Sequence, residues 1–162
     1  ADWSNSTNRE YFDEVVRYHV SGRLKVAPEH TEDQVLRYMR KPDFNLFVEL
    51  KEKFDTINRK NGLKQQLIPY FISSHPGCTI EHMQKLSEKV SKLGLHLEQV
   101  QDFTPTPMTL ASTIFYTGVD PYTGKQVFTE RSKEGKLKQR DLFFLKSQTN
   151  KRVLSKKRKK KL

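Results

Sequence analysis

Residues 67–77 read LIPYFISSHPG, a continuous apolar run that ends in a polar turn. An uninterrupted apolar run of this length is typical of a parallel strand that is buried on both faces. The turn leads to Thr79, which we expect to cap a helix that ends at Gly94. The stretch therefore predicts a strand followed directly by a helix, which is the repeating unit of an α/β fold.

The same unit recurs on either side of this stretch. Residues 23–28 predict a short buried strand upstream, and residues 97–103 predict a third strand downstream. Strands that alternate with helices in this way are typically parallel and joined by right-handed crossovers. We therefore expect an α/β fold with about three parallel strands. Because open sheets usually have four or more strands, we expect this sheet to be part of a larger sheet or barrel.

Apolar residues at intervals of three and four predict the helices around these strands. Thr31 has the residue type of a helix N-cap, and Gln34 follows at the capping-box position. Pro42 is expected to end that helix, and Asn61-Gly62 the next one. The predicted helices cover residues 11–20, 31–41, 45–60, 79–93 and 108–116.

The pattern weakens after residue 117, and we expect three regions along the chain. Residues 1–117 form the α/β body, residues 118–150 an irregular extension and residues 151–162 a basic tail. Within the extension, residues 125–129 predict a short strand and residues 133–146 a helix.

Positive charge is concentrated in the tail. The formal net charge is +11, and eight of the last twelve residues are Lys or Arg. The rest of the chain has 22 basic and 19 acidic residues, a charge of +3. A run of like charges repels itself and can bind RNA, DNA or anionic lipid through counterion release. The alternatives are a solubilising terminus and a stand-alone nucleic-acid-binding module, most simply for RNA.

The cysteine content and the lengths of the apolar runs limit the metal sites and the cellular location that we expect. Cys78 is the only cysteine, so the chain can form no internal disulfide and no Cys-rich metal site by itself. The sequence has no apolar run long enough to span a membrane and no signal peptide. We expect a cytoplasmic protein, and because the chain starts at Ala1 we expect it to be a piece of a longer one.

Polar residues follow each predicted strand. Ligands bind at the carboxyl ends of the strands in parallel α/β folds, so these side chains predict a site at that face. The candidates are Glu29, His30, Ser73, Ser74, His75, Gln101, Asp102 and Thr104. Each has a structural alternative, such as capping the next helix or satisfying the backbone of a turn. Cys78 with His75 could form a nucleophilic pair at a helix N-terminus, and a buried, unreactive cysteine is the alternative.

Several segments resemble YgiQ-type radical SAM proteins. Residues 24–42 resemble their fourth strand–helix unit, residues 67–77 their fifth strand and loop, and residues 99–109 their sixth strand. Residues 116–125 resemble the segment that follows the barrel in these proteins. The resemblance covers residues 11–145, so we expect the C-terminal half of a radical SAM barrel followed by the family's extension.

The resemblance implies a partial (βα)6 TIM-like barrel that binds a 4Fe–4S cluster and S-adenosylmethionine (SAM) at its C-terminal face. In that family a Cys-x-x-x-Cys-x-x-Cys motif holds the cluster, and its reduction cleaves SAM to a 5′-deoxyadenosyl radical. Cys78 alone cannot supply three thiolates, so we expect the motif upstream of Ala1 and an inactive isolated chain. We also expect this isolated half-barrel to aggregate or to need the rest of the radical SAM domain as a partner.

By position, the resemblance assigns five SAM-binding residues. Glu29 ends the fourth strand, where the family places a polar contact to SAM. Ser73 and Ser74 correspond to the region near the ribose and adenine, and Phe103 and Thr104 to the region near the adenine. The resemblance assigns no catalytic acid or base, and the substrate stays open.

Overall fold

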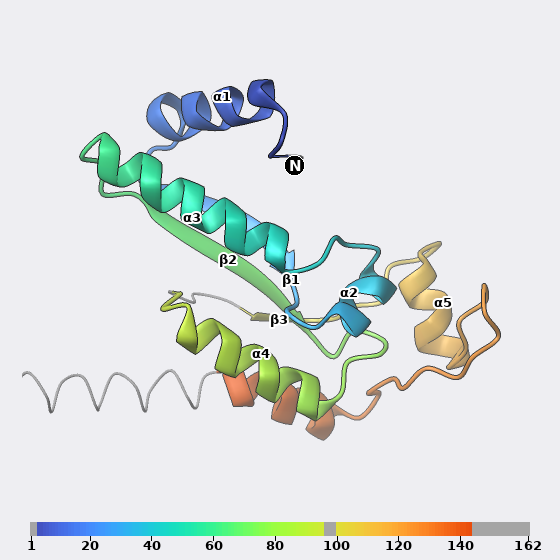
Figure 1. The fold of residues 1–162 in the computed structure, drawn as a ribbon. Coiled ribbons are helices and arrows are strands. Elements are labelled where there is room, and N and C mark those ends of the chain that lie inside the picture. Colours follow the sequence, from blue (N-terminus) through green and yellow to red (C-terminus); the bar gives the residue numbers. More distant parts are fainter. Residues whose placement is uncertain (1–2, 96–99, 144–162) are drawn as a thin grey trace, which may run out of the picture.

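The computed structural model describes residues 3–95 and 100–143 (Figure 1). Its centre is a parallel sheet with the strand order β1–β2–β3. The strands are β1 (Arg23–Glu29), β2 (Gln66–Ser73) and β3 (Val100–Asp102). The predicted α/β fold with three parallel strands is confirmed, and it is consistent with a portion of a TIM-like barrel. The first part of the third predicted strand, residues 97–99, lies outside the described residues.

The helices flank this sheet in the order that the sequence predicts. They are α1 (Ser6–Glu14), the π-helical segment η1 (Val15–His19), α2 (Asp33–Met39), α3 (Asn45–Lys60), α4 (Ile80–Lys92) and α5 (Leu110–Thr117). Residues 133–143 are also helical. Figure 1 shows β2 between α3 and α4, with α2 and α5 beyond the carboxyl ends of the strands and residues 133–143 beside α4. Both helices and loops therefore lie at the carboxyl ends of the strands.

The core forms between β2 and the helices on one face of the sheet. Phe71 on β2 is fully buried, and its ring centroid lies 5.6 Å from that of Phe143 in the helix of residues 133–143. Phe54 on α3 and Leu86 on α4 belong to the same buried cluster. Burial of a large apolar side chain of this kind contributes about 2 kcal/mol. The extension is therefore packed into the core of the body.

The other face of the sheet carries more polar residues. On β1, Leu24 and Val26 pack against the core, whereas Lys25 is exposed. The hydroxyl of Tyr70 on β2 forms a hydrogen bond with Oε1 of Gln101 on β3. Lys25 therefore lies on the face opposite the helices, a point that alternation alone leaves open. The interior face of an incomplete barrel would have this composition.

Two prolines accompany an irregularity between β1 and β2. The register runs regularly to the pair of Val26 and Pro69, and it shifts before the pair of Glu29 and Phe71. Pro28 lies inside the shift, and neither proline has an N–H to donate. The missing donors explain why the regular pairing is interrupted after Val26 and Pro69 and resumes, with a shifted register, at Glu29 and Phe71.

Two local predictions are wrong. Thr31 is not the N-cap of α2, because the helix begins at Asp33 with Glu32 as its cap. The backbone N–H of Glu32 donates to Nδ1 of His30, 3.0 Å away, which holds the chain extended one residue longer. Residues 125–129 form no strand; a single antiparallel bridge joins Val119 to Gln126 and closes the turn between them.

The predicted boundaries after residues 117 and 150 stay predictions. The basic tail of residues 151–162 lies outside the described residues, so the nucleic-acid-binding alternative stays a prediction as well. Within residues 3–95 and 100–143, no helix has both the length and the apolar character needed to cross a bilayer.

Candidate functional site

The carboxyl ends of β2 and β3 are joined by side-chain and backbone bonds. Ser73 Oγ donates to Oδ1 of Asp102, 2.6 Å away, and the Phe103 N–H donates to the Ser73 carbonyl at 2.8 Å. Ser73 is fully buried. The two strand ends thus form one unit, as expected for neighbouring parallel strands.

Ser74, the next residue, adopts a conformation that is rare for a residue with a side chain. Its φ is +59°, it is 1% exposed, and its backbone N–H donates to Oε1 of Gln139 at 3.0 Å. Its buried hydroxyl has no hydrogen-bond partner among the described residues. Strained backbone and an unpartnered buried hydroxyl are both uncommon in cores and are enriched at functional sites.

Glu29 repeats this conformation at the end of β1, where its φ is +65°. Its carboxylate is mostly buried and forms an ion pair with Lys41 Nζ at 3.0 Å. Burial, and then the charge of Glu29, raise the pKa of Tyr70. The same charge partly opposes the effect of burial, which lowers the pKa of His75. Glu29 is thus close enough to act electrostatically on both aromatic side chains.

His75 and Phe103 form an aromatic contact between the ends of β2 and β3. Their ring centroids are 4.9 Å apart, and Phe103 continues to Phe115 of α5 at 5.8 Å. His75 Nδ1 lies 2.9 Å from the Pro76 carbonyl, so this nitrogen carries the proton and Nε2 keeps its lone pair. Thr104 is different: it is exposed, and its hydroxyl reaches only the Asp102 carbonyl at 3.5 Å.

Of the two alternatives for Cys78, the structure supports a buried, unreactive cysteine rather than a nucleophilic pair with His75. Cys78 Sγ lies 3.5 Å from Nε2 of His30 instead. The Cys78 N–H donates to the His75 carbonyl at 2.8 Å, which closes a turn and directs the His75 ring toward Phe103. Burial raises the pKa of the Cys78 thiol to about 12. A buried, protonated thiol is a poor nucleophile, so the structural alternative for Cys78 holds.

His30 also has a structural role rather than the polar strand-end role considered for it. It is fully buried, and its Nδ1 accepts from the Glu32 N–H. Burial, followed by the charges of His82, His75 and Lys89, lowers its pKa to about 3. A neutral His30 therefore accepts a hydrogen bond from the N–H of Glu32, the N-cap residue of α2, and packs against Cys78.

An iron–sulfur cluster does not fit on the residues of this chain. Three thiolates are needed, and Cys78 is the only cysteine of the sequence. Its raised pKa further disfavours the thiolate form. In the part of the chain that the structure describes, no group of three or more His, Cys, Asp and Glu residues could hold a metal ion.

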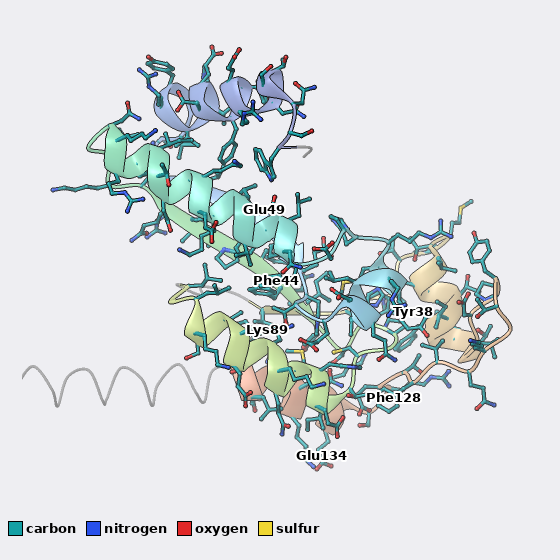
Figure 2. All side chains as sticks on the ribbon, viewed as in Figure 1. Tyr38, Phe44, Glu49, Lys89, Phe128 and Glu134 are labelled. Atoms are coloured by element: carbon teal, nitrogen blue, oxygen red, sulfur yellow. The ribbon has the colours of Figure 1, made fainter. Side chains whose placement is uncertain are left out.

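Two residues at this end of the sheet escape sequence reasoning. Gln139 and Arg140 come from the helix of residues 133–143 and reach the ends of β2 and β3. Figure 2 shows the start of that helix at Glu134, near the N-terminal end of α4 and close to Phe128. The one sequence signal for a buried Gln139 is its place three and four residues before Leu142 and Phe143, on the same face of the predicted helix.

Comparisons with known proteins identify relatives for most of the chain. A UPF0313 protein of Bacteroides thetaiotaomicron is 56% identical over 141 residues, which is 87% of this chain and 23% of that protein. A UPF0313 protein of Porphyromonas gingivalis is 57% identical over 83% of this chain and 21% of that protein. One of Methanosarcina acetivorans is 42% identical over 88% of this chain. The chain spans about a quarter or less of the relatives that it matches.

A family model adds detail at the C-terminal end. Residues 98–153 match DUF3362, a domain of unknown function. The homologues of this chain are thus UPF0313 proteins with a DUF3362 domain, and UPF0313 is the YgiQ-type family. The resemblance seen in the sequence is confirmed at that level. The match begins just before β3, so it includes the third strand, α5 and the helix that carries Gln139.

Proposed function

We propose that this chain forms part of the SAM-binding face of a radical SAM iron–sulfur enzyme, whose cluster ligands lie outside the chain. Its homologues are UPF0313 proteins, and its sequence resembles the second half of a radical SAM barrel. Parallel α/β folds bind their ligands at the carboxyl ends of the strands, which is where the candidate residues gather.

One observation supports the proposal most directly. Glu29 and Ser74 end neighbouring strands, and both have φ values near +60°. Such strain costs roughly 1–3 kcal/mol per residue and persists where the surrounding structure has a use for it. At Ser74 the strain accompanies a buried hydroxyl that has no partner within the described residues. The two strained residues therefore mark the strand-end face where we place SAM.

The chemistry of the residues suits SAM. The carboxylate of Glu29 can accept hydrogen bonds from an ammonium group or a ribose hydroxyl. Phe103 offers an aromatic ring for adenine, as base-binding sites commonly do. SAM in such enzymes supplies a radical that abstracts a hydrogen atom from the substrate. The residues of this chain would bind and orient SAM, and Thr104, which is exposed next to Phe103, would be open to contact with it.

Binding measurements on the full-length protein that contains this chain test the proposal. The probe is S-adenosylhomocysteine, which binds without being cleaved, and calorimetry gives its Kd. We expect Glu29→Gln to weaken binding about tenfold, the cost of one charge-assisted hydrogen bond. Glu49→Gln is the matched control, because Glu49 is an exposed carboxylate on α3 and is not one of the predicted SAM-binding residues (Figure 2).

Two results would contradict the proposal. The first is a failure of the unaltered protein to bind S-adenosylhomocysteine or SAM at millimolar concentration. The second is equal affinity in the Glu29→Gln and Glu49→Gln variants, which would place SAM away from the end of β1. A Phe103→Leu variant with unchanged affinity would remove the aromatic contact from the account.

A further inference from the structure

The loop that follows β2 is held in an unusual conformation. Ser74 has a φ of +59° and Gly77 a φ of +84°, so two residues of this short loop lie in the left-handed region. All residues from 74 to 78 are buried. A buried loop needs partners for each backbone N–H and carbonyl group, and a single turn cannot supply them all.

Gln139 supplies two of these partners. Its Oε1 accepts from the Ser74 N–H at 3.0 Å, and its Nε2 donates to the Cys78 carbonyl at 3.1 Å. One carboxamide therefore bridges both ends of the loop. Gln139 is 2% exposed, and Cys78 Sγ lies 3.5 Å from the same Oε1. A carboxamide offers an acceptor and a donor side by side, which are the two partners that the Ser74 N–H and the Cys78 carbonyl need.

Two neighbouring contacts extend the same connection. The Gly77 N–H donates to the Phe128 carbonyl at 2.8 Å, in the segment before the helix of residues 133–143. Arg140 Nη1 lies 3.6 Å from Oδ2 of Asp102, whose other oxygen accepts from Ser73. The region of residues 128–140 thus contacts the ends of β2 and β3 from one side.

We infer that Gln139 is a positioning residue, which sets the conformation of loop 74–78 and through it the SAM-binding face. This inference rests on the proposed function. It gives the DUF3362 region a role within the site rather than beside it, because Gln139 lies in the matched residues 98–153. Loss of the carboxamide leaves the Ser74 N–H and the Cys78 carbonyl buried without partners, and the loop relaxes away from its strained form.

The test uses the full-length protein with Gln139→Met, which keeps the side-chain length and removes both hydrogen bonds. The control is Phe143→Leu, which loosens the same helix at its contact with Phe71 on β2. Hydrogen exchange of the Ser74 amide reports the loop, and the Kd of S-adenosylhomocysteine reports the site. In Gln139→Met we expect exchange at Ser74 about tenfold faster and binding about tenfold weaker. In Phe143→Leu we expect both within about twofold of the unaltered protein, although its thermal stability falls as well.

Gln139→Glu provides a graded second variant. It keeps an acceptor for the Ser74 N–H and loses the donor to the Cys78 carbonyl. We expect its Ser74 exchange to stay closer to that of the unaltered protein than to that of Gln139→Met. Ser74 exchange in Gln139→Glu more than about tenfold faster than in the unaltered protein would show that the acceptor does not hold Ser74, and it would overturn the inference even if Gln139→Met fails to fold.

The outcomes separate the two proposals. If the unaltered protein does not bind S-adenosylhomocysteine, the proposed function fails and the positioning role fails with it. If the unaltered protein binds but Gln139→Met keeps its affinity and its Ser74 exchange, only the positioning role is overturned. Equal effects of Gln139→Met and Phe143→Leu on both readouts would also overturn it, because they would reflect general destabilisation.

Discussion

The hydroxyl of Ser73 donates to Asp102 Oδ1 at 2.6 Å, and this bond joins the last residues of β2 and β3. Asp102 Oδ2 faces Arg140 at 3.6 Å. One carboxylate thus connects two strands of the sheet with the helix of residues 133–143. The candidate site is therefore built on a rigid strand-end unit, and its residues are held by contacts from both the body and the extension.

Replacement of Ser73 by Ala tests this connection. The variant removes the hydroxyl that donates to Asp102, and we expect the free energy of unfolding to fall by about 1–3 kcal/mol. The Phe103 N–H bonds the Ser73 carbonyl, so its amide exchange reports local opening of the strand ends. We expect faster exchange there than in a Thr104→Ala control, because Thr104 is exposed and its substitution should change stability by less than about 0.5 kcal/mol. Equal exchange in both variants would show that the bond contributes nothing.

Gly77→Ala tests how closely the loop packs. The φ of Gly77 is +84°, and a Cβ at this position would overlap the ring of Tyr38 on α2. Figure 2 shows Tyr38 between α2 and α5, and the atoms that the Cβ would meet are ring atoms rather than the end of a flexible side chain. We expect the free energy of unfolding, measured by chemical denaturation, to fall by about 2–3 kcal/mol.

Gly62→Ala is the matched control for that substitution. Gly62 also has a positive φ, +64°, and a Cβ there would meet nothing within 4 Å. Backbone strain alone predicts a cost of about 1 kcal/mol. The difference between the two variants isolates the overlap with Tyr38, and a Gly62→Ala variant as unstable as Gly77→Ala would contradict the packing account.

Stability should fall in acid because of His30. Its pKa is about 3 in the folded protein against 6.5 for the ordinary side chain. A folded-state pKa below the unfolded value contributes stability above pH 6.5, and this contribution is lost as the pH falls from 6.5 toward 3. Between pH 7.5 and pH 5 the loss amounts to about 2 kcal/mol. We expect urea denaturation to show this fall, and His75 adds to it in the same direction because its pKa is lowered too.

His30→Asn should flatten this acid dependence. Asn keeps a side-chain acceptor near Nδ1, which receives the Glu32 N–H, and has no titrating group. The control is His19→Asn at an exposed site, which should leave the dependence between pH 7.5 and pH 5 unchanged. If His30→Asn keeps the full slope, His30 is not the group that titrates on unfolding.

Cys78 should resist alkylation in the folded protein. Its thiol pKa of about 12, against an ordinary value of 9.0, lowers the thiolate fraction about a thousandfold at neutral pH. Iodoacetamide at pH 7.5 should therefore react with Cys78 at least that much more slowly than in urea, where the thiol is also accessible. A native rate within about tenfold of the unfolded rate would contradict the buried position.

The raised pKa of Cys78 also predicts that the free energy of unfolding declines between pH 9 and 12, because the thiol ionises at a lower pH in the unfolded protein.

Local sequence signals predict elements with clear ends. The helix over residues 45–60 has the predicted bounds, since its apolar face and the Asn61-Gly62 stop are both local features. Thr79 caps α4 as predicted, and His82 completes the capping box. The prediction for Thr31 is wrong because the Glu32 N–H bonds His30 Nδ1 and the helix begins only at Asp33. Residue types alone do not reveal such a bond.

The sequence predicts which strand ends meet, but not every residue that the structure brings to the candidate site. The topology of parallel strands brings Glu29, Ser73, Ser74 and Phe103 to one end of the sheet. It says nothing about Gln139, which lies 65 residues beyond its partner Ser74. The short separation in sequence suggested His75 as a possible partner of the Cys78 thiol. In the structure the partner is His30, which follows β1. Contacts of this kind depend on packing rather than on local pattern.

The central claim is that this chain belongs to a SAM-cleaving enzyme. The direct test is formation of 5′-deoxyadenosine by the full-length protein, purified without oxygen, reconstituted with iron and sulfide and reduced. We predict 5′-deoxyadenosine from SAM together with about four irons per chain, and loss of most of this product in Glu29→Gln but not in Glu49→Gln. A protein that binds no iron and releases no 5′-deoxyadenosine under these conditions would contradict the claim.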